Sequence, residues 1–533
     1  MASFLKDRAS SLAFALGVLT VIAGVLLHLP MFWMGKDLGF RLAGMPMDPG
    51  MIAGMFMILG GVALAAWGLL PKNVAAQVHA SRHISIAAPE DAPLTSAHWQ
   101  LMAVLVIALI IDVMKPASLG FVMPGLKEEY AVTAARGAAL PFSALAGTVV
   151  GSVFWGIMAD IYGRKATIML SAVMFVGTSI CGAMPSLNWN IVMCFLMGAA
   201  AGGMLPVTYA LLAETMPTRH RGWALVLVGG LGSGGGYFAA SGFSAWLEPI
   251  FSWRILWLLN LPTGLLLLSL SGFIPESAKF LLARGRRAEA QAAMARFGTR
   301  SIAHGAERED PYAAPVLLDH EEHRGGLWAP GFRGRTAALT TIALSWGLVN
   351  FGLLLWMPAD FVARGLPMAA ASKLLAQSAL IAFPTVIVGA FFYSRWSSKG
   401  SLLAATAVST LGLFGVLAMD ALGIHLPPVA IIALLIVGIN ALLAIVLPYA
   451  SESYPLHIRG RATGWIAACT KAGGLAAQSL SIAALVPPLG VVAALILAPV
   501  IAGLALTWAF CPETRGVDLR SIDRGLSPAA RGA

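Results

Sequence analysis

Long apolar stretches recur along almost the whole chain, and each is long enough to cross a lipid bilayer. A helix needs roughly 18 or more apolar residues to span about 30 Å of hydrocarbon. Hydrophobic residues make up 58% of the 533 residues and charged residues only 11%, whereas a soluble domain carries about 25% charged residues. The sequence therefore predicts an all-α polytopic membrane protein.

Fourteen such stretches can be placed along the chain, in two groups. Two lie near residues 11–33 and 50–70, ahead of a polar connector at 71–98. The other twelve lie near 99–125, 139–159, 166–184, 189–213, 223–246, 253–273, 337–359, 371–393, 401–419, 427–449, 462–485 and 488–510. The first stretch is too long for a signal peptide and no small-residue cleavage site follows it, so we expect a retained transmembrane helix.

Lysine and arginine fall mostly on one side of these predicted spans, and this bias predicts the orientation. With the N-terminus in the cytoplasm, the basic residues left outside are Lys36, Arg41, Lys127, Arg136, Arg254 and Arg364. The positive-inside rule then places both termini in the cytoplasm of a multi-pass plasma (inner) membrane protein. The net charge of +10 reflects this bias, and we expect no nucleic-acid partner.

A repeated motif divides the last twelve spans into two sets of six. AETMPTRHRG at 213–222 recurs as SESYPLHIRG at 451–460, an offset of 238 residues, and PES at 275–277 recurs as PET at 512–514. Such internal repeats are typical of transporters. The predicted plan is an accessory hairpin and connector at 1–96, six-helix bundles at 97–274 and 336–511, a cytoplasmic linker at 275–335 and a tail at 512–533.

Several motifs together resemble those of the major facilitator superfamily, nearest to its sugar porters and metabolite:proton symporters. They are GIMADIYGRK at 156–165, both E-x-x-P-x-x-x-R-G stretches, PESAKFLLARGR at 275–286 and PETRG at 512–516. The resemblance covers residues 97–520 and implies a secondary active transporter that works by alternating access, with no enzyme activity and no cofactor. The first two spans lie outside the family's twelve-helix plan, and the sequence does not say why they are there.

The motif loops predict a cytoplasmic gate. In the 156–165 loop, glycines would let two helix ends approach, while Asp160 accepts hydrogen bonds and Arg164 reaches an acidic partner. The resemblance implies that the gate holds the outward-facing state through ion pairs. Its expected residues are Gly156, Asp160, Gly163, Arg164, Lys165, Glu214, Arg221, Glu276, Glu452, Arg459 and Glu513. The second-half loop at 393–400 lacks the Asp and the G-R-K triplet, which predicts a one-sided latch; alternatively, the basic residues only follow the positive-inside rule.

Asp112 and Lys115 lie near the middle of a predicted span. A charge there costs roughly 2.5–3.5 kcal/mol on insertion scales, so such residues usually face a protein interior or a water-filled cavity. The resemblance places Asp112 at the first acid of the symporters' D-x-x-D pattern, with Lys115 at the second. Residues three apart share a helix face, so we expect the two groups to neutralise each other while both point inward. The alternative is a purely structural pair.

Other polar residues within spans are candidates for the substrate cavity. Lys471 is a second cation near mid-membrane, flanked by glycines that would admit a close helix or ligand. Asn350, Trp356, Asn440 and Gln478 lie in spans whose equivalents line the family's cavity, and Tyr237 follows a glycine run. Each could instead form hydrogen bonds between helices or pack there, and Lys471 could reach an interface.

Asp112, Lys115 and Lys471 sum to +1 when Asp112 is ionised and to +2 when it is protonated. A dry cationic cavity favours an anion. The sequence therefore predicts proton-coupled uptake of a small organic anion, a carboxylate, with Asp112 carrying the proton and Lys115 or Lys471 holding the substrate. The alternatives are uptake of a neutral sugar or polyol, drug efflux driven by protons, and a nutrient sensor. We expect a monomer in the lipid bilayer that binds substrate and protons, and no metal, because the histidines lack ligand spacing.

Overall fold

The computed structural model shows a nearly all-helical membrane protein, as the sequence predicts. It describes residues 8–70, 84–87, 93–283, 286–298, 300–303, 326–420, 423–454 and 456–515. Thirteen helical stretches in this part of the chain are long and apolar enough to cross a membrane. The stretch expected at 462–485 forms helix α22 (Leu456–Ile482) but is not among the thirteen, so the count of fourteen is not confirmed.

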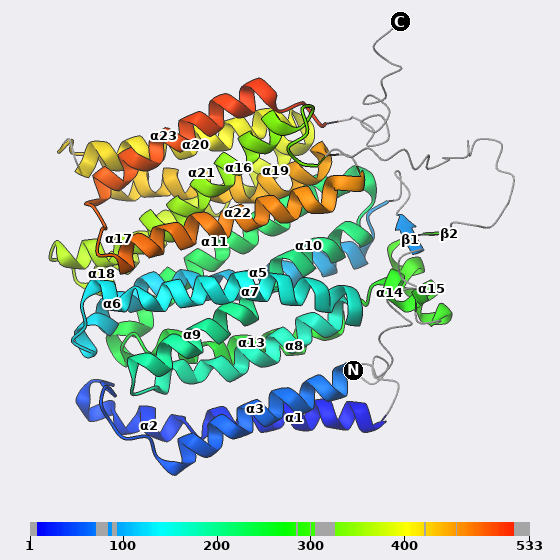
Figure 1. The fold of residues 1–533 in the computed structure, drawn as a ribbon. Helices are drawn as coiled ribbons and strands as arrows, with labels where there is room; N and C mark the ends of the chain where they lie inside the picture. Colours follow the sequence, from blue (N-terminus) through cyan, green and yellow to red (C-terminus); the bar gives the residue numbers. More distant parts are fainter. Residues whose placement is uncertain are drawn as a thin grey trace, which may run out of the picture.

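The N-terminal hairpin lies along the outside of the first helix bundle, where its helices contact α8 (Figure 1). It comprises α1 (Arg8–Leu26), α2 (Leu29–Met34), the 3₁₀ helix η1 (Lys36–Leu38) and α3 (Pro49–Leu69). Glycines let α1 and α3 approach closely, because a Cβ on Gly17 would lie only 2.5 Å from the backbone nitrogen of Ala65.

The loop of this hairpin is bound to a buried ion pair of the core. The backbone amides of Leu42 and Ala43 donate to a carboxylate oxygen of Glu129 at 2.6 and 3.0 Å. Arg254, which is fully buried, donates to the same carboxylate at 2.6 Å, and the indole of Trp253 does so at 3.0 Å. A buried ion pair is stable only when its remaining hydrogen-bonding capacity is satisfied, so the hairpin completes this site.

The first bundle carries the long helices α5 and α11, which lie side by side. A Cβ on Gly236 would lie 2.6 Å from Cβ of Val113, so the glycine run of α11 lets α5 approach closely. The elements are α5 (Ser96–Glu129), α6 (Ala134–Gly137), α7 (Ala139–Tyr162), α8 (Arg164–Gly177), η2 (Thr178–Ala183), α9 (Leu187–Ala201), α10 (Met204–Thr215), α11 (Thr218–Phe251), α12 (Ile255–Leu258), α13 (Asn260–Leu270) and η3 (Ser271–Phe273).

The linker contributes two short helices and one strand. These are α14 (Ala278–Ala283), α15 (Arg287–Phe297) and β2 (Arg300–Ala303). Strand β1 (Ile84–Ala87), from the connector after the hairpin, pairs antiparallel with β2. This small sheet departs from the all-helical prediction, because it joins two four-residue strands from segments that are far apart in sequence. Residues 304–325 of the linker and the tail from residue 516 lie outside the described residues.

The second bundle repeats the plan of the first. Its elements are α16 (Arg333–Leu348), the π-helix η4 (Val349–Leu353), α17 (Leu354–Ala363), α18 (Met368–Ala382), α19 (Thr385–Arg395), α20 (Ser398–Asp420), α21 (Pro428–Ser453), α22 and α23 (Leu489–Phe510). The domain boundaries at 96, 274, 335 and 511 stay a prediction.

The two bundles are stacked, with the hairpin on the far side of the first one (Figure 1). One end of the stack, called the motif end here, carries β1, β2, α14 and α15. α11 packs against α18, α19 and α21 of the second bundle. Towards the opposite end, a Cβ on Gly120 of α5 would lie 2.8 Å from the carbonyl oxygen of Leu355 in α17. The bundles are therefore in tight contact towards the end opposite to the motif end.

Candidate functional site

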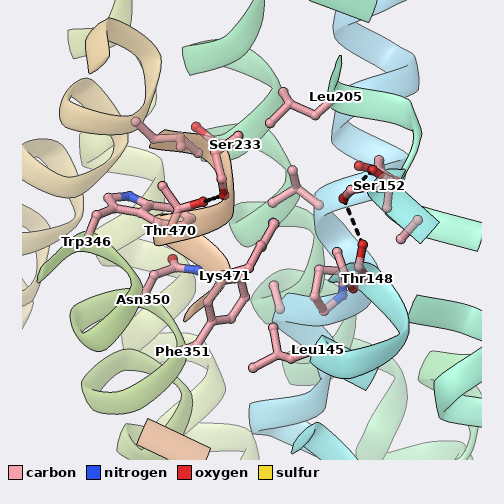
Figure 2. Close-up of a pocket in the computed structure, with 18 of the residues that line it drawn as sticks. Leu145, Thr148, Ser152, Leu205, Ser233, Trp346, Asn350, Phe351, Thr470 and Lys471 are labelled. Atoms are coloured by element: carbon pink, nitrogen blue, oxygen red, sulfur yellow. Dashed lines mark hydrogen bonds between the residues drawn. The ribbon is translucent and has the colours of Figure 1, made fainter. Parts of the chain in front are cut away.

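A cavity of about 330 Å³ lies between the two bundles. Residues of α5, α7, α10 and α11 line it from the first bundle, and residues of α16, η4, α17, α21 and α22 from the second. Figure 2 shows Asn350, Phe351 and Lys471 on one side of it and Leu145 and Thr148 on the other. Most of the lining is apolar, and this volume is in the range of small-molecule sites.

Asp112 lines this cavity from the middle of α5. Its side chain is 7% exposed, and one carboxyl oxygen, Oδ1, has no hydrogen-bond partner within the described part of the chain. Pro116, one turn further along, lines the cavity too. A buried carboxyl group with an unused oxygen is available to a proton or a ligand.

Lys115 does not line the cavity, which corrects the prediction that it faces inward beside Asp112. Its side chain is 2% exposed, and its Nζ lies 2.8 Å from the centroid of the Phe175 ring in α8. No ion pair joins it to Asp112 among the described residues, where Lys115 Nζ has no hydrogen-bond partner. Residues three apart differ by about 60° around a helix. On α5, which is surrounded by other helices, that angle turns Asp112 to the cavity and Lys115 into the first bundle.

Lys471 lines the cavity from α22. Its Nζ lies 5.4 Å from the centroid of the Phe351 ring, a distance at which an ammonium group is attracted by an aromatic face. The neighbouring glycine admits a close helix, since a Cβ on Gly473 would lie 2.2 Å from the carbonyl oxygen of Leu344. Among the described lining residues only Asp112 and Lys471 are charged. The net charge of the cavity is therefore zero when Asp112 is ionised and +1 when it is protonated, whereas the sequence predicts +1 and +2.

The other predicted cavity residues divide into two groups. Asn350, Asn440 and Tyr237 line the cavity. Gln478 does not, because its side-chain amide donates to the backbone carbonyl of Phe351 at the π-helix η4. Trp356 is likewise absent from the lining. Gln478 therefore serves helix packing, the alternative considered from the sequence.

Sequence reasoning missed five polar lining residues, Thr148, Ser152, Tyr209, Ser233 and Thr470. Threonine and serine are common in membrane helices, where they bond to their own backbone, so nothing in the sequence distinguished them. Thr148 and Ser152 indeed donate to the carbonyl oxygens of Ala144 and Thr148 at 2.9 and 2.7 Å. Tyr209 lies five residues before the motif glutamate Glu214, and that position could have marked it.

The first gate network lies at the motif end and joins α8, α10 and the start of the linker. Arg164 Nη2 donates to Glu214 at 2.9 Å, and the backbone amide of Arg164 donates to Glu276 at 3.0 Å. Ser277 donates to the other oxygen of Glu214 at 2.6 Å. Gly163 has φ of +98°, and a Cβ there would lie 2.6 Å from a carboxylate oxygen of Glu276. These contacts therefore hold α8 and α10 of the first bundle to the start of the linker.

Glu276 is buried in this network, and burial raises its pKa to about 7, against the smaller opposing effects of the Ser277 and Lys165 amides and of Arg164. The ionised form of Glu276 is therefore costly here. Gly156 plays no part in helix approach, because a Cβ there would meet nothing within 4 Å; this corrects the prediction for that glycine. The side chain of Asp160, in α7, lies outside the described part.

The second half has its own network, which corrects the prediction of a one-sided latch. Glu513 accepts hydrogen bonds from the hydroxyls of Ser397 and Ser398 and from three backbone amides. Partial burial opposes ionisation, but these donors lower the pKa of Glu513 to about 2. Hydroxyl groups thus replace the arginine of the first half, a substitution that a search for the G-R-K triplet overlooks.

Glu452 belongs to the same network and also touches the first half. It accepts hydrogen bonds from Tyr393 at 2.6 Å and from Thr514 at 3.1 Å. A Cβ on Gly222 of α11 would lie 2.7 Å from its carboxylate, so Glu452 is in contact across the bundles. Arg221 precedes that glycine in α11, and the side chain of Arg459, in α22, lies outside the described residues.

Comparisons with known proteins agree with this architecture. The niacin transporter NiaP of Acinetobacter baylyi (strain ATCC 33305 / BD413 / ADP1) is 25% identical over 390 residues, 73% of this chain and 87% of that protein. The 4-hydroxybenzoate transporter PcaK of the same strain is 32% identical over 225 residues, 41% of this chain and 49% of that protein. The fold is similar to that of the proton:xylose symporter XylE, with a TM-score of 0.62 and 16% identity over 80% of this chain and 99% of that one. Residues 101–478 match the family model of the Major Facilitator Superfamily, and the chain therefore belongs to this superfamily of transporters.

Proposed function

We propose that the protein takes up a small organic anion, a carboxylate, together with a proton. The observation that carries this proposal is the charge arrangement of the central cavity. One carboxyl group, Asp112, and one ammonium group, Lys471, face about 330 Å³ of mostly apolar space. Ionisable groups inside a membrane protein are costly and usually mark the path of an ion or a substrate.

Charge balance provides the coupling. In the empty cavity the charges of ionised Asp112 and Lys471 cancel. When a substrate carboxylate binds beside Lys471, the lysine neutralises the substrate and the negative charge of Asp112 is left unbalanced. A proton on Asp112 then restores neutrality. Unbalanced charge is expensive at low dielectric, so proton and substrate favour each other's binding. This coupling is reciprocal, because each ligand must change the affinity for the other by the same factor.

The substrate class is proposed from the cavity walls and from the relatives. The two relatives are named for transporting niacin and 4-hydroxybenzoate, and both compounds carry a carboxylate on an aromatic ring. The walls offer apolar and aromatic surface for such a ring, including Leu145, Phe121, Phe351 and Trp346. We therefore propose an aromatic carboxylate as the substrate.

Alternating access would proceed by rocking of the two bundles around this cavity. The two networks at the motif end would keep each half rigid, and the contact of Glu452 with α11 at Gly222 would form or break as the halves move. At the opposite end, Gly120 and Leu355 would separate. Close packing through a glycine suits such a contact, because it forms over a short distance and is lost at once when the helices part.

The remaining features of the proposal concern the setting of the protein. The motif end is proposed to face the cytoplasm of the plasma (inner) membrane, as the positive-inside rule predicts from the sequence. The monomer is the proposed transport unit, because the cavity is enclosed by the two bundles of one chain.

Uptake by purified protein in proteoliposomes tests the proposal. A panel of labelled aromatic carboxylates and neutral sugars would be offered with and without an inward proton gradient. The proposal predicts that carboxylates alone are accumulated and that the gradient drives their accumulation. Accumulation of sugars alone would refute it in favour of the alternative raised by the sequence.

A further inference from the structure

Four polar atoms in the cavity wall have no hydrogen-bond partner in the described part of the chain. They are Asp112 Oδ1, Tyr209 Oη, Tyr237 Oη and Asn440 Nδ2. Tyr237 and Asn440 are only 8% and 7% exposed. Buried polar groups in proteins are nearly always hydrogen-bonded, so a cluster of unsatisfied ones around a cavity indicates that a ligand satisfies them. Asp112 is the proposed proton site, and the other three atoms have no role in the mechanism so far.

These three uncharged groups gather at α11. A Cβ on Gly234 would lie 3.3 Å from Asn440 Nδ2, and a Cβ on Gly229 would lie 1.9 Å from the hydroxyl oxygen of Tyr209. Tyr237 belongs to α11 itself. The missing side chains at these glycines therefore let polar groups from α10 and α21 reach the same helix as Tyr237. We call Tyr209, Tyr237 and Asn440 the α11 wall.

The lysine of the cavity lies on a different helix, which shares only one main neighbour, α21, with α11. Lys471 is on α22, which packs mainly against α16, α7 and α21, whereas α11 packs mainly against α5, α18 and α21. Tyr209 and Tyr237 thus lie on α10 and α11, which are not among the main neighbours of α22, whereas α21, which carries Asn440, packs against both α11 and α22. A substrate whose carboxylate lies beside Lys471 presents the remote end of its ring to the rest of the lining.

We infer that the α11 wall is a second recognition site, which selects acids that carry a hydrogen-bonding group away from their carboxylate. The inference rests on the proposed function. A ring hydroxyl fits the wall, because its oxygen accepts from the Asn440 amide and its hydrogen is donated to a tyrosine hydroxyl. A methyl group of similar size fills the same space but leaves all three polar groups unsatisfied. Sites built in this way reject the analogue that lacks the polar group.

Equilibrium binding to the detergent-purified protein, measured by calorimetry, tests this inference. The two probes are 4-hydroxybenzoate and 4-methylbenzoate, which differ little in size. The native protein is expected to prefer the hydroxylated acid by on the order of tenfold, the factor for one or two hydrogen bonds. Tyr237→Phe and Asn440→Leu should each reduce this preference several-fold, by weakening binding of 4-hydroxybenzoate and leaving that of 4-methylbenzoate within about threefold.

Trp346→Phe is the matched control. Trp346 lines the same cavity, but its indole nitrogen already donates to the carbonyl oxygen of Ile439 at 2.9 Å. Because Trp346 belongs to the surface proposed for the ring, this variant should change the affinity for both acids alike and leave the preference between them unchanged. Equal affinities in the native protein, or an unchanged preference in both wall variants, would overturn the inference while leaving the proposed function intact. Failure of both acids to bind would overturn the proposed function, and the inference with it.

Discussion

The two lysines within the membrane helices α5 and α22 provide the sharpest perturbation, because the structure separates two residues that the sequence treats alike. Lys471→Met removes the only positive charge from the described cavity lining. Lys115→Met removes a charge that lies against Phe175, inside the first bundle. Methionine is close in length to lysine and apolar, so each variant deletes the charge with little change in volume.

The expected magnitudes differ widely between the two variants. A hydrogen bond to a charged group contributes about 1.5–3 kcal/mol, so Lys471→Met should weaken carboxylate binding roughly 10- to 150-fold. Lys115→Met should change binding by less than about threefold, since it touches no proposed ligand. The thermal stability of the Lys115→Met variant should stay equal or rise. The cost of burying a charge without an ionic partner exceeds the cation–π attraction of about 2 kcal/mol that is lost with the lysine.

Binding of 4-hydroxybenzoate and thermal unfolding would be measured on both variants in the same detergent. Lys471→Arg is the control that restores the charge, and it should recover part of the lost affinity. The reasoning is refuted if Lys115→Met abolishes binding while Lys471→Met binds normally. Equal losses in both variants would show that the charges act as one unit across α5, contrary to their placement.

Further predictions concern the gate and the hairpin. Gly163→Ala should lower stability by about 1–3 kcal/mol, visible as a lower melting temperature, because φ is +98° and the new Cβ would meet Glu276; a normal melting temperature would contradict this. Burial raises the pKa of Glu276 from 4.5 to about 7, so the cost of its ionised form is fully present above about pH 7 and disappears as the pH falls towards about 4.5. Acidification over this range should therefore stabilise this conformation by about 3 kcal/mol. Glu276→Gln should flatten that part of the profile of melting temperature against pH. Glu129→Gln should destabilise the protein by about 3–5 kcal/mol, because Arg254 would keep its charge without a partner and the Leu42 and Ala43 amides would lose part of their acceptor. Limited proteolysis measures this effect, and the hairpin loop should be cleaved faster in the variant than in the native protein.

Hydropathy and repeats predicted the helical architecture because they depend on properties averaged over many residues. The motif residues Arg164, Glu214 and Glu276 lie together in one hydrogen-bonded network, whereas their role as a gate stays a prediction. The direction in which Lys115 points could not be predicted. Asp112 and Lys115 are about 60° apart around α5, and the helices that surround α5 decide what each of them faces. The pairing of β1 with β2 and the docking of the hairpin loop on Glu129 depend on contacts between distant segments, for which one sequence carries no signal.

The wall residues show the same limit from another side. Tyr237 was a candidate from the sequence because it follows a glycine run, yet the function of those glycines became visible only when Tyr209 and Asn440 were found against them. A hydroxyl or amide in a membrane helix is satisfied by its own backbone or by a neighbouring helix in most cases. Only the three-dimensional arrangement shows which of these groups lack such a partner.

The central claim is that one proton accompanies each carboxylate and that Asp112 carries it. Proteoliposomes with a pH-sensitive dye inside and no imposed gradient test it directly, with protein-free liposomes as the control for passive entry of the acid. On addition of 4-hydroxybenzoate, the account predicts acidification of the lumen with the native protein and none above the control with Asp112→Asn, which should still exchange labelled for unlabelled substrate. Carboxylate uptake without acidification, or undiminished acidification with Asp112→Asn, would contradict it.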